Sequence, residues 1–314
     1  MDPVTQAILL SWGWRIDVMI VLALAGTFYL RGWVRLRRRA RGHGRYSGYR
    51  RSPWRLTAVW RPISYCTGLL IIALALMSPI DVLGQQLFFM HMIQHLLLMM
   101  AAPPLLLIAA PMPFLLWGLP DRARLAVGGW IGRGLHRESR SRHTIRTVTN
   151  PGVVWLIWVI VLIGWHDPAM YNAALQYEWV HDLEHITFFP GEYALLVACH
   201  RGWATYSQAV RSDWAHGAGC FRYPAKHAHG VVLTMTTAVI YSYYTAVPRV
   251  WGLTALADQQ IGGFIMWVPG SMMYIVAALI LIYRILDKED QKPAMPESKW
   301  GSQEKLAAPG TERD

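Results

Sequence analysis

Charged side chains are scarce in this sequence. Only 16% of its 314 residues are Asp, Glu, Lys or Arg, whereas a soluble domain carries about 25%. Hydrophobic residues make up 54%, and 16 tryptophans add side chains suited to a membrane–water interface. A net charge of +11 would suggest a nucleic-acid partner in a soluble protein, but the apolar fraction argues against one. We therefore expect a membrane protein with no nucleic acid among its partners.

Cysteine is also scarce. The three cysteines, Cys66, Cys199 and Cys220, are odd in number and have no CxxC or CxxxC spacing. Such a set excludes a disulfide framework, which needs an even number of cysteines. It also excludes a zinc site built from closely paired thiolates. A metal site in this chain must therefore use other ligands.

Long apolar runs occupy most of the remaining chain. A helix needs about 20 mainly apolar residues to cross a bilayer, and seven segments approach or exceed that length. All are expected to be helical, because an open strand cannot satisfy its backbone hydrogen bonds in lipid. The segments are residues 9–30, 62–80, 87–117, 153–165, 179–200, 229–247 and 261–286.

The segment 87–117 is too long for one straight span, and four prolines interrupt its second half. The distribution of positive charge indicates how often it crosses. With a single crossing, 28 of the 30 Lys and Arg residues fall on one side, and only Arg15 and Arg249 fall on the other. Since basic loops stay in the cytoplasm, this favours an all-α integral membrane protein with seven transmembrane helices, its N-terminus outside and its C-terminus cytoplasmic.

Two parts of the chain can be separated by composition. The seven-helix membrane domain is expected to cover residues 1–286. Residues 287–314 are rich in Pro, Glu, Lys and Ser, which predicts a disordered cytoplasmic tail. The basic linkers 31–61 and 118–150 are interpreted as contacts with anionic membrane lipids.

This topology brings histidines to the outer ends of two spans. His91 and His95 lie four residues apart, so their rings share one face of the third span. The same spacing joins His181 and His185 in the fifth span. Ionisable groups at membrane depth are energetically costly and usually face a cavity or a partner. We predict that the two pairs face one another and bind a metal; the alternatives are a polar packing network and a proton-handling site.

Neutral imidazole suits copper, zinc, iron and nickel. A thioether one turn beyond His95 is a soft ligand and favours Cu(I). Carboxylates near metal-bound histidines commonly accept a hydrogen bond from the second ring nitrogen. The residues predicted to support the four histidines are Asp167, Asp258, Glu184, Met99 and Gln259.

Three stretches of the sequence resemble the motifs of one family. The first is residues 91–95 followed by 102–104. The second is the pair His181 and His185, with Glu184 directly before His185. The third is residues 256–263 followed by 266–270. Over residues 15–286, and in the same order, the chain resembles the CtaG-type cytochrome c oxidase assembly factors, an integral-membrane family linked to caa3-type oxidases.

The resemblance implies a multi-pass protein of the bacterial inner membrane that helps mature a haem-copper oxidase. It implies copper as the metal, supplied to the oxidase catalytic subunit from the outer face. A soluble copper chaperone on the outer side is a further candidate partner. The positions carried over are His91, His95, His181, His185 and Asp258. Since no span carries an obvious nucleophile with its base, the protein is not expected to be an enzyme.

Two other classes of function stay open from the residues alone. A membrane-embedded zinc hydrolase acting on a lipid would use the same histidines, with Glu184 or Asp258 as general base. A bis-histidine haem protein would take His95 and His185 from two facing helices.

Overall fold

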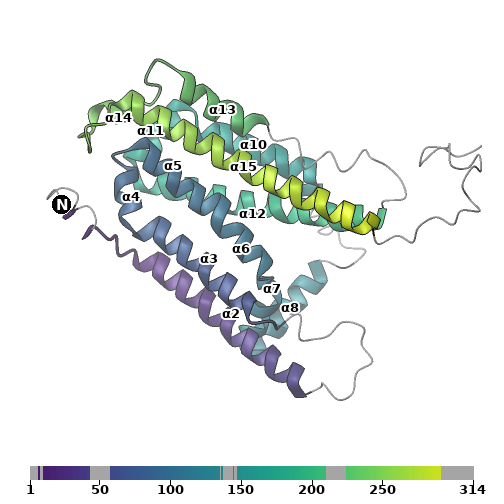
Figure 1. Ribbon diagram of the computed structural model, residues 1–314. Helices are drawn as coiled ribbons and strands as arrows, with labels where there is room; N and C mark the ends of the chain where they lie inside the picture. Colours follow the sequence, from purple (N-terminus) through teal and green to yellow (C-terminus); the bar gives the residue numbers. More distant parts are fainter. Residues whose placement is uncertain are drawn as a thin grey trace, which may run out of the picture.

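The computed structural model describes residues 6–7, 10–42, 57–134, 136, 144, 147–209 and 224–290. Within these ranges the chain forms helices and no strand, which confirms the predicted all-α class. The long helices run side by side (Figure 1). The short helices α4 (Pro79–Gly84), α11 (Pro168–Gln176) and α14 (Tyr243–Ala246) gather at the end of the bundle where α2 (Ile16–Gly42) begins, which we call the N-terminal end of the bundle (Figure 1).

The remaining helices build the body of the bundle. In the part of the chain that the structure describes, three stretches are long and apolar enough to cross a membrane: residues 16–40, 60–77 and 88–108. A fourth counts if the bent pair of α10 (Pro151–Trp165) and α11 acts as a single span. The helices are α2 (Ile16–Gly42), α3 (Trp60–Met77), α5 (Phe88–Leu96), the π-helical turn η2 (Leu97–Ala101), α6 (Ala102–Ile108), α7 (Pro111–Gly118), α8 (Asp121–Gly134), α10 (Pro151–Trp165), α12 (Glu178–Ala209), α13 (Pro224–Met235) and α15 (Ala255–Asp290).

The proline-rich third segment forms one continuous path through α5, η2 and α6. Pro103 and Pro104 lie in the first turn of α6, where the missing backbone N–H matters least. The path breaks at Ala110, whose left-handed φ of 51° ends the run before α7 begins. α7 then packs closely on α2. The two helices are so close that a Cβ added at Gly32 would overlap the backbone carbonyl of Phe114.

The sixth predicted segment, residues 229–247, is only partly helical. α13 ends at Met235, and the chain from 236 to 242 is irregular. Side-chain amides from the start of α15 bind this stretch: the Gln259 amide accepts from Ile240 N (2.7 Å), and the Gln260 amide donates to Thr236 O (3.0 Å). These bonds replace the helical hydrogen bonds, so the prediction of a helix up to residue 247 is wrong.

The first and last predicted segments, residues 9–30 and 261–286, also have other bounds as helices. α2 begins at Ile16 rather than near residue 9, and α15 continues to Asp290, past the expected boundary at 286. Residues 291–314, which make up most of the predicted tail, lie outside the described residues.

The outward surface of the bundle is apolar. On α10, the side chains of Leu156, Ile160 and Ile163 are all exposed, while Trp158 and Leu162 on the opposite face are buried in the main core. Exposed apolar surface on such a scale is typical of helices in contact with lipid. The fold therefore indicates a membrane protein.

Candidate metal centre

The N-terminus of α5 is held by a residue far away in sequence. Leu87 precedes the helix in an extended conformation and provides no side-chain cap. Instead, the fully buried carboxylate of Asp258, on α15, accepts hydrogen bonds from Phe88 N (2.9 Å) and Phe89 N (3.0 Å). Its charge is paired with Arg249 at 3.0 Å. This contact fixes the position of His91, one turn further along α5.

The start of α12 is attached to the start of α2. Arg15 donates to both carboxylate oxygens of Asp182, at 2.5 and 2.9 Å. The hydrogen bonds to Asp182 raise the pKa of the Arg15 guanidinium, so the guanidinium stays charged. Asp182 directly follows His181, so this ion pair helps to fix the first histidine of α12.

The four histidines lie at the corners of a quadrilateral. Within each helix the ring centroids are 4.4 Å apart for His91 and His95, and 4.3 Å apart for His181 and His185. Between the helices, His91 lies 5.3 Å from His181, and His95 lies 5.3 Å from His185. The structure therefore brings together the two pairs at the i, i+4 spacing.

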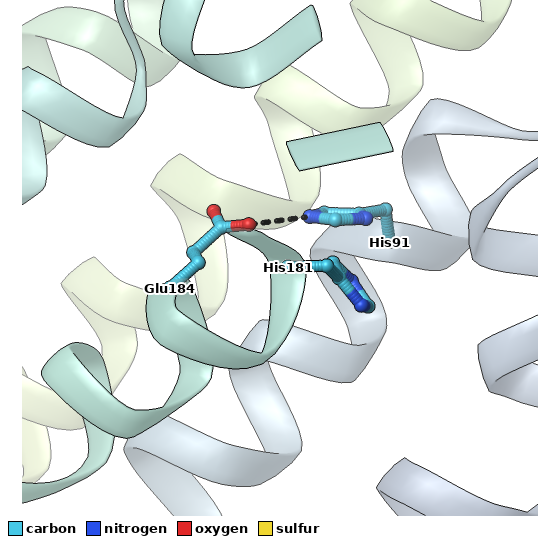
Figure 2. Close-up of side chains that lie close together, drawn as sticks. All are labelled: His91, His181 and Glu184. Carbon is cyan, nitrogen blue, oxygen red and sulfur yellow. Dashed lines mark ion pairs between the residues drawn. The ribbon is translucent and has the colours of Figure 1, made fainter. Parts of the chain in front are cut away.

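Glu184 lies among these rings rather than behind them. Figure 2 shows its carboxylate directed from α12 toward His91, with His181 beside it. One carboxylate oxygen is 3.3 Å from His95 Nε2, and the other is 3.8 Å from His91 Nε2. Single ligand atoms of His91, His181 and Glu184 lie within 4.8 Å of one another, so these three groups could hold a metal ion. We call the four histidines and Glu184 the His–Glu cluster.

The His–Glu cluster is buried and rich in unpartnered polar atoms. Each of its five side chains is at most 8% exposed. His91 Nε2 and His95 Nε2 lie 2.5 Å apart, close enough to share one proton. Six other nitrogen or oxygen atoms of the cluster are buried with no hydrogen-bond partner within the described part of the chain. Because buried polar atoms are normally hydrogen-bonded, such a concentration favours a site for a ligand.

Three of the predicted supporting residues form their hydrogen bonds away from the His–Glu cluster. Asp167 is exposed and caps α11, accepting from Ala169 N at 3.0 Å. Asp258 caps α5, and Gln259 binds the irregular stretch after α13. Each satisfies backbone groups that the sequence alone leaves unassigned, and among the described residues neither carboxylate forms an ion pair with an imidazole. Glu184 is the supporting carboxylate that the structure does place against the rings.

Met99 lies in the wall of a small cavity beside His95. The cavity has a volume of about 30 Å³. It lies between α5, η2, α10 and α15, and its wall consists of Met92, His95, Leu96, Met99, Met100, Leu162, His166 and Met266. Met99 is thus next to the His–Glu cluster, as its position one turn beyond His95 predicts.

Sequence reasoning gave no separate role to Gln94, which is fully buried between the two histidines of α5. Its amide nitrogen donates to Ala75 O (3.0 Å) and to the Asp81 carboxylate (2.7 Å), and so ties α5 to α3 and α4. Burial raises the pKa of Asp81, and the hydrogen bond from Gln94 opposes this rise. In the sequence, Gln94 can be recognised as a polar residue within an apolar run, which needs a hydrogen-bond partner when it is buried.

The fold and site define a helical membrane protein with a buried histidine–carboxylate cluster. The family described as cytochrome c oxidase caa3 assembly factor matches residues 27–288. The match covers most of the chain and includes every residue of the His–Glu cluster. The chain belongs to this family, as its motifs predict.

Individual relatives add little about function. The chain is 25% identical over 297 residues to an uncharacterised protein of Mycobacterium leprae, and 26% identical over 306 residues to uncharacterised proteins of Mycobacterium bovis and Mycobacterium tuberculosis. Each match covers 91% of this chain but only 41% of the relative. The chain therefore spans less than half the length of these relatives. No solved structure matches it.

Proposed function

We propose that this protein binds copper in the His–Glu cluster and supplies it while a haem-copper oxidase is assembled. Membership of the assembly-factor family supports the role in assembly. The observation that carries copper binding is the convergence of four buried imidazoles and one carboxylate with six unpartnered polar atoms. Imidazole nitrogen is a good ligand for copper, whereas hard cations prefer oxygen-only sites.

The geometry suggests how the ion is accommodated. His91 Nε2 and His95 Nε2 face each other at 2.5 Å, close enough to share one proton but too close for a metal ion between them, so the rings would have to turn apart to bind one ion. Metal ligands must be deprotonated, so binding displaces that proton. Glu184 at 3.3 Å from His95 Nε2 offers a negative charge that offsets the charge of the ion.

We further propose seven spans, with the N-terminus outside and the C-terminus in the cytoplasm. The spans would be α2, α3, the α5–α6 path, α10, α12, the short α13 and α15, within a membrane domain covering residues 1–286. Arg15 and Arg249, the two basic residues assigned to the outside, are each paired with a carboxylate, so neither adds an unpaired positive charge there. The basic helix α8 lies at the other end of the bundle (Figure 1).

With this orientation the N-terminal end of the bundle, where α5 and α12 begin, faces outward. The partners would be the oxidase catalytic subunit in the membrane and a soluble copper chaperone on the outer side. Membrane lipids would surround the apolar faces. The expected location is the bacterial inner membrane, and the role is that of a metal chaperone rather than an enzyme.

The two alternative functions fit the geometry less well. A bis-histidine haem needs a flat slot between its two axial rings, but His95 and His185 are in edge contact at 5.3 Å. A lipid hydrolase needs room for its substrate, and ligand pockets commonly measure about 300–1,000 Å³. The cavity that adjoins His95 measures about 30 Å³.

The proposal can be tested in cells that lack their own copy of the gene. Cells carrying His181→Ala or Glu184→Gln are expected to assemble a haem-copper oxidase that contains less copper. Excess copper in the medium should partly restore the copper content of the oxidase. His136→Ala, which removes an exposed histidine outside the cluster, is the matched control and should behave as wild type. Normal copper content of the oxidase in both cluster variants would overturn the proposal.

A further inference from the structure

The cavity beside His95 has an unusual wall. Methionine accounts for 14 of the 314 residues, yet four of the eight side chains that line the cavity are methionines. They come from three elements: Met92 from α5, Met99 and Met100 from η2, and Met266 from α15. All four are buried, at most 7% exposed.

We propose that this methionine-lined cavity is a second copper station, selective for Cu(I), that receives its ion from the His–Glu cluster. The inference rests on the proposed function, because the cluster would supply the ion. Thioethers are soft ligands that select Cu(I) over harder divalent cations. None of the eight lining residues carries a carboxylate, so the wall offers no charge to offset that of a divalent ion.

The size of the cavity suits one ion rather than a molecule. A volume of about 30 Å³ is enough for a single water-sized guest. Methionine side chains are flexible and ordinarily fill irregular gaps in a core. Here four of them line one cavity, so four thioethers converge on the same space.

The backbone at this point is also unusual. The π-helical turn η2 begins directly after α5 and carries both Met99 and Met100, whose side chains line the cavity. Such turns are rare and often occur at functional sites. The irregular turn therefore coincides with the part of the wall that contributes two thioethers.

His95 connects the two stations. Its Nε2 faces His91 and Glu184 in the cluster, while its ring also lines the cavity and its buried Nδ1 has no hydrogen-bond partner among the described residues. His166 also lines the cavity; its Nδ1 is hydrogen-bonded to Leu162 O at 2.7 Å, which leaves Nε2 as the nitrogen that could bind an ion. A Cu(I) ion can pass between the stations by exchanging ligands, with no change in oxidation state.

The test uses the full-length protein in detergent and two probe ions. Ag⁺ serves as a redox-inert substitute for Cu(I), and Zn²⁺ reports on the His–Glu cluster. The double variant Met99→Leu, Met266→Leu removes two thioethers with nearly conserved volume. It is expected to lose one equivalent of bound Ag⁺ while keeping its Zn²⁺. Met112→Leu, at an exposed methionine on α7, is the matched control.

A second variant separates this inference from the function on which it rests. Glu184→Gln with His181→Ala should lose Zn²⁺ and retain Ag⁺ in the cavity. If the methionine variant binds as much Ag⁺ as wild type, the second station is overturned, whatever happens to Zn²⁺. If wild type binds no Zn²⁺ and the methionine variant binds less Ag⁺ than wild type, the second station in the cavity is supported and the proposal for the His–Glu cluster is overturned.

Discussion

The carboxylate of Asp258, on α15, accepts a hydrogen bond from the backbone N–H of Phe88 and so caps a helix that begins 170 residues earlier in the chain. The first histidine of the His–Glu cluster lies one turn beyond this cap. The same carboxylate neutralises Arg249. One buried acidic group therefore fixes both the start of α5 and the charge balance at the N-terminal end of the bundle.

Replacing Asp258 with alanine should destabilise the protein strongly. The change leaves Arg249 without its counter-charge and two backbone N–H groups without an acceptor, so we expect a loss of about 3 kcal/mol. Asp258→Asn keeps an acceptor oxygen and should lose less. The measurement is thermal unfolding of the purified protein in detergent.

The control for this prediction is another helix cap. Asp167→Ala removes the exposed cap of α11, for which a loss of about 1 kcal/mol is typical. A melting temperature for Asp258→Ala equal to or above that of Asp167→Ala would contradict the role given to Asp258.

Two glycines on α2 should respond in opposite ways to alanine. At Gly32 an added Cβ would overlap the Phe114 carbonyl of α7, so the helices must separate, and we expect a loss of roughly 3 kcal/mol. At Gly26 the nearest atom is a flexible side-chain carbon of Leu69 at 3.5 Å, an ordinary contact. Gly26→Ala should therefore be neutral or stabilise by up to about 1 kcal/mol. Thermal unfolding of the two variants side by side checks the difference, and equal effects would contradict the close α2–α7 contact.

The proposed topology can be checked by chemical labelling of intact cells. In a chain whose three cysteines are replaced by alanine, a cysteine in place of Glu178, at the exposed start of α12, should react with a membrane-impermeant thiol reagent. A cysteine in place of Gly132, on α8, should react only after the membrane is opened. The reverse pattern would put the His–Glu cluster at the cytoplasmic face.

Local patterns in the sequence were enough to predict the helical class and the positions of the four histidines. Apolar length predicts the helical class, and the four-residue spacing of His91 with His95 and of His181 with His185 predicts two rings on one face of each helix. Glu184 lies one turn beyond His181 and one residue before His185. It was predicted only as a supporting residue, although the structure places it among the rings.

The remaining features depend on contacts between distant segments. Asp258 and Gln259 bind backbone groups of α5 and of the stretch after α13, and no periodicity in the sequence points to those partners. The prediction of a helix up to residue 247 was wrong for this reason. The apolar composition of that stretch does not reveal that side-chain amides of α15 bind its backbone. Asp167 was given a role near the imidazoles, but its position directly before Pro168 is the usual signature of a helix cap.

The most direct test of the copper site is the metal content of the purified full-length protein, loaded with copper and then freed of unbound ion. Elemental analysis should find at least one copper per chain in wild type. His91→Ala with His181→Ala should reduce this by about one equivalent, while His136→Ala should leave it unchanged. If the double variant retains as much copper as wild type, the His–Glu cluster is not the site, and the central claim is contradicted.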